Sequence, residues 1–246
     1  MNQAATFLVE NFPSPCALLL GGPLGLLWAF ACLRFAGHLK HRYSLRTGYS
    51  RKTFHFLIFF SAMATHLAWG PKWVCLFGGM TSLVIFYAVS RGSGNVLYEA
   101  MAREKDAPHR THYIVVPYFA TLIGGLASNI LFGPAATAGY LVAGWGDAVG
   151  EPVGVRFGRH TYRVPARRGV TCTRSYEGST AVFAVSMVAV CAAVAATPEL
   201  AYSWRAVYAV PIIALVCALA EAVSPHGWDN ATMQLVPAFL VHVWFV

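Results

Sequence analysis

Acidic side chains at the ends of apolar stretches are the residues whose types and spacing could do chemistry. The chain has only ten Asp and Glu residues, and a charged side chain inside a lipid-facing segment costs free energy and usually lines a site or cavity. Proteins hold Mg²⁺ through one or two carboxylates together with substrate phosphates. The pattern therefore predicts a metal–phosphate site drawn from five acids: Asp147, Glu151, Glu177, Glu221 and Asp229.

Three of these acids are the predicted metal ligands. Asp147 and Asp229 are expected to hold Mg²⁺ on the phosphates, directly or through water, and Glu177 to support them. Glu151 follows Asp147 by four residues, so the two share one face of a helix. The alternative for each acid, and for Glu177 above all, is an ion pair with an arginine of a neighbouring loop.

Basic residues could complete such a site. Arg51 and Lys52 precede an apolar stretch, and Arg174 lies shortly before another. Arginine binds phosphate through paired hydrogen bonds and lysine acts as a point charge, so these three could neutralise a transferred phosphoryl group. His55 or Glu151 could accept the proton. Alternatively, Arg51 and Lys52 contact lipid headgroups or set the topology, and His55 is a buried histidine with an ordinary partner.

Glycines recur every four residues in the same region. Gly146, Gly150, Gly154 and Gly158 line one face of a helix with hydrogen. Such a face allows either close packing of a second helix or the approach of a ligand to the backbone, and the spacing leaves both open. No GxxxxGK[ST] motif of soluble nucleotide-binding proteins is present.

The elements that position these residues are membrane helices. Hydrophobic residues make up 57% of the 246 residues and charged residues only 11%, whereas soluble domains carry roughly a quarter charged residues. Backbone groups in lipid must bond internally, so the long apolar runs predict helices. We expect one all-α membrane domain over 1–246, a polytopic bundle with eight spans: 13–34, 53–69, 73–90, 113–132, 135–156, 178–196, 206–223 and 230–246.

The distribution of charge predicts the topology. Of the 18 Lys and Arg residues, six lie in 34–52, four in 91–111 and six in 156–176. Basic loops at alternate junctions are typical of cytoplasmic loops, so both termini are expected outside and the site on the cytoplasmic face. This placement, and not nucleic acid, explains the net charge of +8. The start carries Glu10 and no basic residue before the first span, unlike a cleaved signal peptide.

The six cysteines indicate neither a disulfide framework nor a zinc site. No two of them form a CxxC pair, and most fall in or beside predicted spans, where a free cysteine behaves as a small apolar residue.

Four segments, in order, resemble the polyprenol kinase family, which includes phytol, farnesol and dolichol kinases. The first is Arg51-Lys52-Thr53-Phe54-His55, and the second is Gly146-Asp147-Ala148 followed by GVRFG at 154–158. The third is RSYEGS at 174–179, and the fourth is Glu221 followed by Asp229-Asn230. The resemblance covers residues 51–246, which would form the catalytic core.

The resemblance implies transfer of the γ-phosphate of CTP to the hydroxyl of a membrane lipid alcohol, with Mg²⁺ as cofactor. The implied catalytic residues are Arg51, Lys52, His55, Asp147, Glu151 and Asp229. The implied nucleotide-binding residues are Gly146, Gly150, Gly154, Gly158, Arg174, Ser175, Glu177, Gly178, Ser179 and Asn230. Two features depart from the family. Residues 159–173 are a longer connection, which could cover the nucleotide or recognise a headgroup, and Thr173 replaces the first lysine of a usual pair.

Other functions stay open. Phosphatidate cytidylyltransferases have a similar core, and PHGWDN at 225–230 echoes part of their signature. A transporter would also carry acids in membrane helices, but it should show inverted repeats; a membrane scaffold would need neither the acids nor the basic pairs. The sequence leaves open which lipid is phosphorylated, the base of the nucleotide and the oligomeric state.

Overall fold

The architecture was examined in a computed structural model, which describes residues 3–165, 172–200, 204 and 206–246. Over these residues the chain is all-α apart from one short two-stranded hairpin. The packing divides the chain into two compact units, residues 1–104 and 105–246, and each is described by itself.

Each of the eight predicted spans coincides with helix. In chain order the helices are α2 (Pro15–Tyr43), α3 (Thr47–Trp69), α4 (Pro71–Arg91), α6 (His112–Phe132), α7 with η3 and α8 (Ala136–Leu141, Val142–Gly146, Asp147–Phe157), α9 (Tyr176–Ala196), α10 (Ala206–Val223) and α11 (Asp229–Phe245). Five helical segments of the described residues are long and apolar enough to cross a membrane: 15–43, 71–91, 112–157, 176–196 and 206–223. These segments are those of an integral multi-pass membrane protein.

The first unit is built on α2, α3 and α4, which pack against one another. Two shorter helices, α1 (Gln3–Glu10) and α5 (Val96–Glu99), complete it. Ser14 caps the start of α2 by accepting a hydrogen bond from the amide of Ala17, and a proline follows at the first helical position. Such a start satisfies amide groups that have no partner within the helix.

A polar network joins the ends of three segments in this unit. The Lys40 ammonium on α2 lies 2.9 Å from Glu104 Oε1 and donates to the backbone oxygen of Glu99 at 2.9 Å. The Thr47 hydroxyl at the start of α3 donates to the same Glu104 oxygen at 2.6 Å. Partial burial raises the pKa of Glu104, but the bonds from Thr47 and Lys40 outweigh it and lower that pKa to about 2.

This network predicts a pH-dependent contribution to stability. Because the folded pKa of Glu104, about 2, is below its ordinary 4.5, its contribution is complete above pH 4.5 and is lost as the pH falls towards 2. Glu104→Gln should lower the free energy of unfolding at neutral pH by less than about 1 kcal/mol, since the carboxylate is largely exposed. Thermal unfolding in detergent from neutral to acidic pH measures this; parallel curves for variant and wild type would contradict it.

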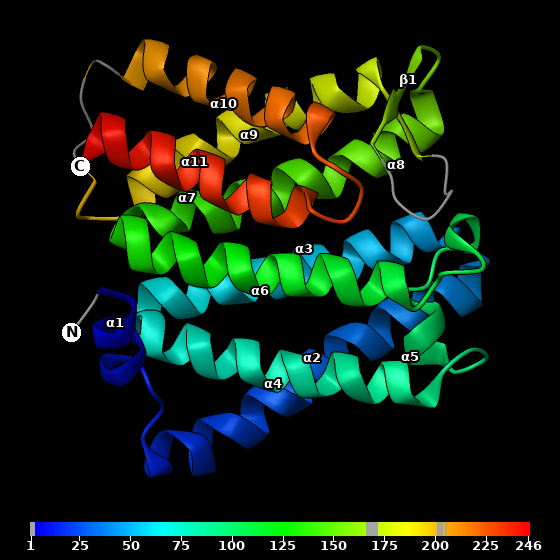
Figure 1. Cartoon of the computed structure of the whole chain (residues 1–246), viewed down its shortest axis with the longest axis horizontal. Helices are drawn as coiled ribbons and strands as arrows, with labels where there is room; N and C mark the ends of the chain where they lie inside the picture. The colour runs from blue at the N-terminus through cyan, green and yellow to red at the C-terminus, as the bar shows by residue number, and fades with distance from the viewer. Residues whose placement is uncertain (1–2, 166–171, 201–203, 205) are drawn as a thin grey trace. The chain divides into compact units, whose positions relative to one another are not determined.

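The second unit is a bundle in which α11 lies between α6 and α10 (Figure 1). The helices α6 and α11 run parallel, because Asn230 at the start of α11 bonds to Pro117 and Thr121 in the first half of α6, and the rings of Phe132 and Phe239 lie 5.8 Å apart further along both helices. The helices α8 and α9 pack together, as do α9 and α10. The starts of α6, α9 and α11 therefore share one end of the bundle with the ends of α8 and α10.

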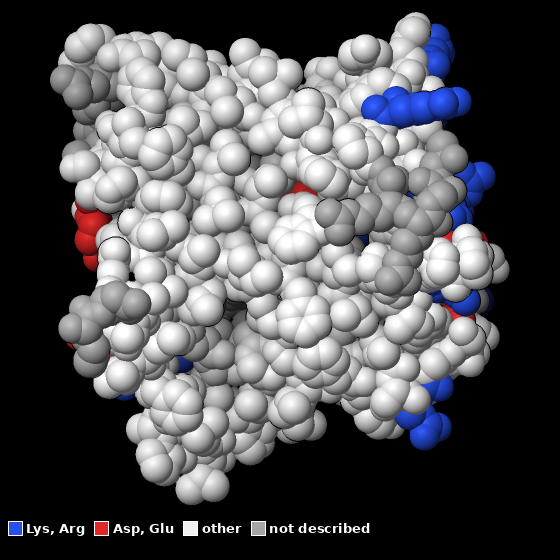
Figure 2. Space-filling model, viewed as in Figure 1, with Lys and Arg blue, Asp and Glu red and all other residues white. Residues whose placement is uncertain are grey.

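A hairpin closes that end of the second unit. Strands β1 (Thr161–Val164) and β2 (Cys172–Ser175) pair antiparallel, with Thr161 opposite Ser175 and Val164 opposite Cys172. The hairpin lies between α8 and α9, and residues 166–171 lie outside the described residues. Lys and Arg surface gathers over this hairpin end (Figure 2), as the prediction of a basic 156–176 loop requires.

Candidate functional site

A buried arginine organises the acidic residues of the second unit. Arg174 is the third residue of β2, and its Nε lies 2.8 Å from Glu221 Oε1 at the end of α10. Its Nη2 donates to Asp229 Oδ2 at 2.9 Å, where α11 begins. The side chains of Arg174, Glu221 and Asp229 are only 12%, 8% and 15% exposed. Two predicted site residues, Arg174 and Asp229, are thus brought into direct contact.

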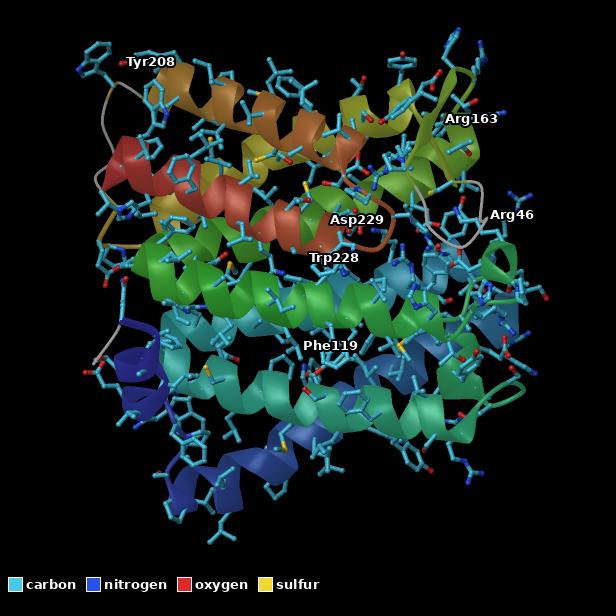
Figure 3. The ribbon with its side chains drawn as sticks, viewed as in Figure 1. Arg46, Phe119, Arg163, Tyr208, Trp228 and Asp229 are labelled. Carbon is cyan, nitrogen blue, oxygen red and sulfur yellow. The ribbon has the colours of Figure 1, made fainter. Side chains whose placement is uncertain are left out.

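The same guanidinium also holds the backbone of the α10–α11 connection. Its Nη1 donates to the carbonyl oxygen of Glu221 and to that of Ser224, the latter at 3.3 Å. These carbonyls belong to the last turn of a helix and have no partner within it. Arg174 therefore serves both as the counter-ion of two carboxylates and as a helix C-terminal cap, rather than as a solvent-facing arginine. Figure 3 shows Asp229 at the start of α11 and Arg163 on the neighbouring hairpin.

Asp147 adds a third negative charge to this region. It is 3% exposed and is the first residue of α8, directly after the π-helical turn η3. Burial lowers the pKa of Arg174. The negative charges of Glu221, Asp229 and Asp147 raise this pKa by a larger amount, so the pKa of Arg174 is above its ordinary value. Single π-helical turns occur often at functional sites. The structure thus places Asp147 within electrostatic range of the Arg174 cluster.

Glu177 contacts backbone and His160. Its Oε1 accepts hydrogen bonds from the amides of Arg159 and His160 at 3.1 and 3.3 Å and lies 3.0 Å from His160 Nδ1. Ser175 caps the same helix, accepting from the amide of Gly178 at 3.0 Å, and Ser179 Oγ lies 2.7 Å from the hydroxyl of Tyr162. These contacts join the end of α8 to the start of α9. A metal-binding role of Glu177 stays a prediction. To bind a metal, the Glu177 carboxylate would have to give up its hydrogen bonds to the amides of Arg159 and His160.

The glycine face of α8 packs against α9. A Cβ atom at Gly146 would lie 2.6 Å from Ser186 Oγ, one at Gly150 2.8 Å from Val182, and one at Gly154 2.9 Å from Ser175 Oγ. At Gly158 the added atom would lie 2.8 Å from the Ser175 side chain. Close helix packing, one of the two interpretations that the spacing allowed, is therefore what the structure shows for this face. Nucleotide contact by these glycines stays a prediction.

This packing predicts a large effect of one methyl group. A Cβ at Gly178 would lie 2.7 Å from the backbone oxygen of Gly150, which cannot move without moving α8. Gly178→Ala should therefore lower the free energy of unfolding by about 1–3 kcal/mol. The matched control is Gly79→Ala on α4, where no atom lies within 4 Å and alanine favours the helix. Thermal unfolding in detergent compares the two; equal midpoints would contradict the prediction.

The remaining predicted residues take other partners. Asn230 donates to Thr121 Oγ1 at 2.8 Å and to the carbonyl oxygen of Pro117 at 3.2 Å, which ties α11 to α6. Glu151 Oε1 lies 3.5 Å from the Lys105 ammonium, so this acid forms the ion pair that was one of its two interpretations.

Three predicted catalytic residues belong to the first unit. Arg51, Lys52 and His55 lie within the first three turns of α3. Lys52 is 5% exposed, and the ring of His55 lies 4.5 Å from that of Phe59. Their catalytic roles stay a prediction, and they are described only within their own unit.

Magnesium binding by Asp147, Asp229 and Glu177 stays a prediction. Among the described residues no group of three or more His, Cys, Asp or Glu side chains is arranged to hold a metal. One oxygen of Asp229 accepts from Arg174, and Glu177 is engaged as described above. Mg²⁺ commonly enters with substrate phosphates and only one or two protein carboxylates, so such a group of three is not required for the predicted role. All six cysteines are free thiols.

Two functional candidates were missed by sequence reasoning. Asp106 Oδ1 lies 3.4 Å from His226 Nε2, and the two residues are 1% and 8% exposed. They are 120 residues apart in the chain, and in the sequence only the motif HGW at 226–228 pointed to His226.

Comparisons of the chain with protein-family models, curated proteins and solved structures find no match.

Proposed function

We propose that this chain is an integral membrane kinase that transfers the γ-phosphate of CTP to the hydroxyl of a lipid alcohol of the phytol, prenol or polyprenol type. The observation that supports it best is the gathering of Asp147, Glu221 and Asp229 around buried Arg174 at the basic end of a helical bundle. Isolated charges at this depth are costly. The carboxylates of Asp147 and Asp229 could orient the Mg²⁺ of a magnesium–nucleotide complex, because Mg²⁺ is held by one or two protein carboxylates together with substrate phosphates.

Phosphoryl transfer needs positioning and electrostatic stabilisation more than covalent chemistry. In the proposal, Asp147 and the second oxygen of Asp229 orient the magnesium–nucleotide substrate. Arg174 acts through Asp229, whose carboxylate it fixes at 2.9 Å, so it is a positioning residue and not a direct phosphate ligand. Arg51 and Lys52 neutralise charge on the transferred phosphoryl group, and His55 or Glu151 accepts the hydroxyl proton.

The proposed topology has eight spans, both termini outside and the site at the cytoplasmic face. Basic residues on the hairpin side of the second unit support this orientation. Because the hairpin begins four residues after α8 ends and finishes directly before α9 begins, the Arg174 cluster would lie at the level of the lipid headgroups. A lipid alcohol that keeps its hydroxyl at that level would meet the nucleotide there without leaving the bilayer.

The experiment that tests the proposal is a transfer assay on purified protein in nanodiscs. Magnesium and γ-labelled CTP, UTP, GTP or ATP are supplied with a panel of prenyl alcohols and diacylglycerol. Label in a lipid alcohol supports the kinase and names both substrates. Release of pyrophosphate from CTP in the presence of phosphatidate would instead favour a cytidylyltransferase, whose signature the HGW segment at 226–228 partly resembles. Silence in both assays would overturn the kinase proposal.

A further inference from the structure

The turn between α10 and α11 is held from two sides. On one side Arg174 binds the carbonyl oxygens of Glu221 and Ser224. On the other side the amide of His226 donates to the carbonyl oxygen of Pro165 at 2.8 Å, and the His226 side chain lies against Asp106. The turn therefore depends on Asp106, on Pro165 after β1 and on Arg174 of β2.

The side chain of His226 is enclosed on several faces. Its Nε2 lies 3.4 Å from Asp106 Oδ1, and its ring centroid lies 4.7 Å from that of Tyr113, at the start of α6. The side chains of His226 and Asp106 are 5% and 2% exposed. Loss of a hydrogen-bond partner at a buried polar group costs free energy. The pair is therefore expected to hold one arrangement.

The next residue forces the chain to change direction. Gly227 has φ of +91°, a conformation that side chains rarely adopt, and a Cβ there would meet Val116 and Pro117 at 3.4 Å. The amide of Trp228 then donates to the carbonyl oxygen of Pro225 at 2.9 Å. Asp229 follows directly as the first residue of α11 (Figure 3). The position of His226 thus sets where α11 begins and where the Asp229 carboxylate lies.

We infer that Asp106 and His226 form a positioning pair: they fix the α10–α11 turn, so that the Asp229 carboxylate is presented to the nucleotide while Arg174 holds its other oxygen. The inference rests on the proposed function for its kinetic consequence, but the fixing of the turn is a statement about the fold alone. Neither residue touches substrate in this role. Both act through Asp229.

Two substitutions of His226 separate this role from general packing. Glutamine can place its Nε2 where the imidazole Nε2 lies and so keep the bond to Asp106. His226→Phe keeps a ring against Tyr113 and loses the bond. His226→Phe should lower kcat about 10–100-fold, the effect of misplacing a group by about 1 Å, with a KM for CTP within about threefold of wild type, and His226→Gln should recover most of the loss. If His226→Phe fails to fold, Asp106→Leu, which has a similar size and no acceptor oxygen, takes its place.

Hydrogen–deuterium exchange of the turn tests the inference without any activity. In His226→Phe, peptides covering 221–232 should exchange faster than in wild type, while His226→Gln keeps the wild-type rate. Native kcat and native exchange in His226→Phe would overturn the inference. Equal losses of kcat in both variants with native exchange would also overturn it, in favour of direct chemistry by the imidazole. If wild type phosphorylates no lipid alcohol, the proposed function fails, and the exchange data alone decide whether the pair fixes the turn.

Discussion

Asp147→Asn is expected to abolish phosphoryl transfer while leaving the protein folded. The carboxylate is 3% exposed and contributes to the electrostatic field at Arg174. The guanidinium nevertheless keeps Glu221 and Asp229 as direct partners. Removing a preorganised charge from the site of phosphoryl transfer should lower kcat by about 10²–10³-fold. The measurement is label transfer from γ-labelled CTP to the lipid alcohol identified in the nanodisc assay.

The control for Asp147→Asn is Glu199→Gln. Glu199 is an exposed acid near the opposite end of the second unit, between α9 and α10, so the variant makes the same change in net charge away from the Arg174 cluster. It should transfer phosphate at the wild-type rate. Both variants should unfold within a few degrees of wild type, because both keep the contacts of Arg174 with Glu221 and Asp229. Near-normal turnover in Asp147→Asn would remove this residue from the proposed site.

Helix positions could be predicted because apolar length is a local property of the sequence. The predicted span at 113–132 corresponds to α6 at His112–Phe132, and the one at 206–223 to α10 with the same bounds. A bilayer span needs about 20 apolar residues, so each stretch shows its ends through the polar residues beside it. The first helix was predicted shorter than it is, since α2 continues to Tyr43 through basic residues that lie beyond the apolar run.

The partners of the acids could not be predicted because they depend on tertiary contacts. The sequence allowed Arg174 to be a phosphate ligand, but the structure gives its guanidinium to Glu221 and Asp229, 47 and 55 residues further on. Likewise Glu177 accepts amides that lie 17 and 18 residues earlier, after α8 ends. The spacing of residues along one helix shows which of them share a face. It does not show which loop folds back over that face.

The hairpin and the buried Asp106–His226 pair were missed for related reasons. Strands β1 and β2 have four residues each, too few for an alternating pattern to stand out beside long helices. Asp106 lies in a polar loop with several basic residues, where an acid is usually solvated. The glycine face, in contrast, was recognised from its four-residue spacing, because a face lined with hydrogen can be read on any helix.

The largest effect on stability is expected from Arg174→Met. This change removes the guanidinium that contacts the buried carboxylates of both Glu221 and Asp229. Breaking a buried ion pair by removing one partner costs about 3–5 kcal/mol. It also removes the bonds that cap the last turn of α10. Denaturation in mild detergent, followed by loss of helical signal, measures the change in free energy of unfolding.

Two comparisons decide whether this cost comes from the buried charges. Arg163→Met alters an exposed arginine on the same hairpin and should change the free energy of unfolding by less than about 0.5 kcal/mol. Adding Glu221→Gln to Arg174→Met removes one of the two buried charges, so the double variant should recover part of the loss, a non-additivity of about 0.5–3 kcal/mol. Strict additivity would mean that water reaches Glu221 and that the cluster is solvated. In that case Arg174 would act mainly as a helix cap.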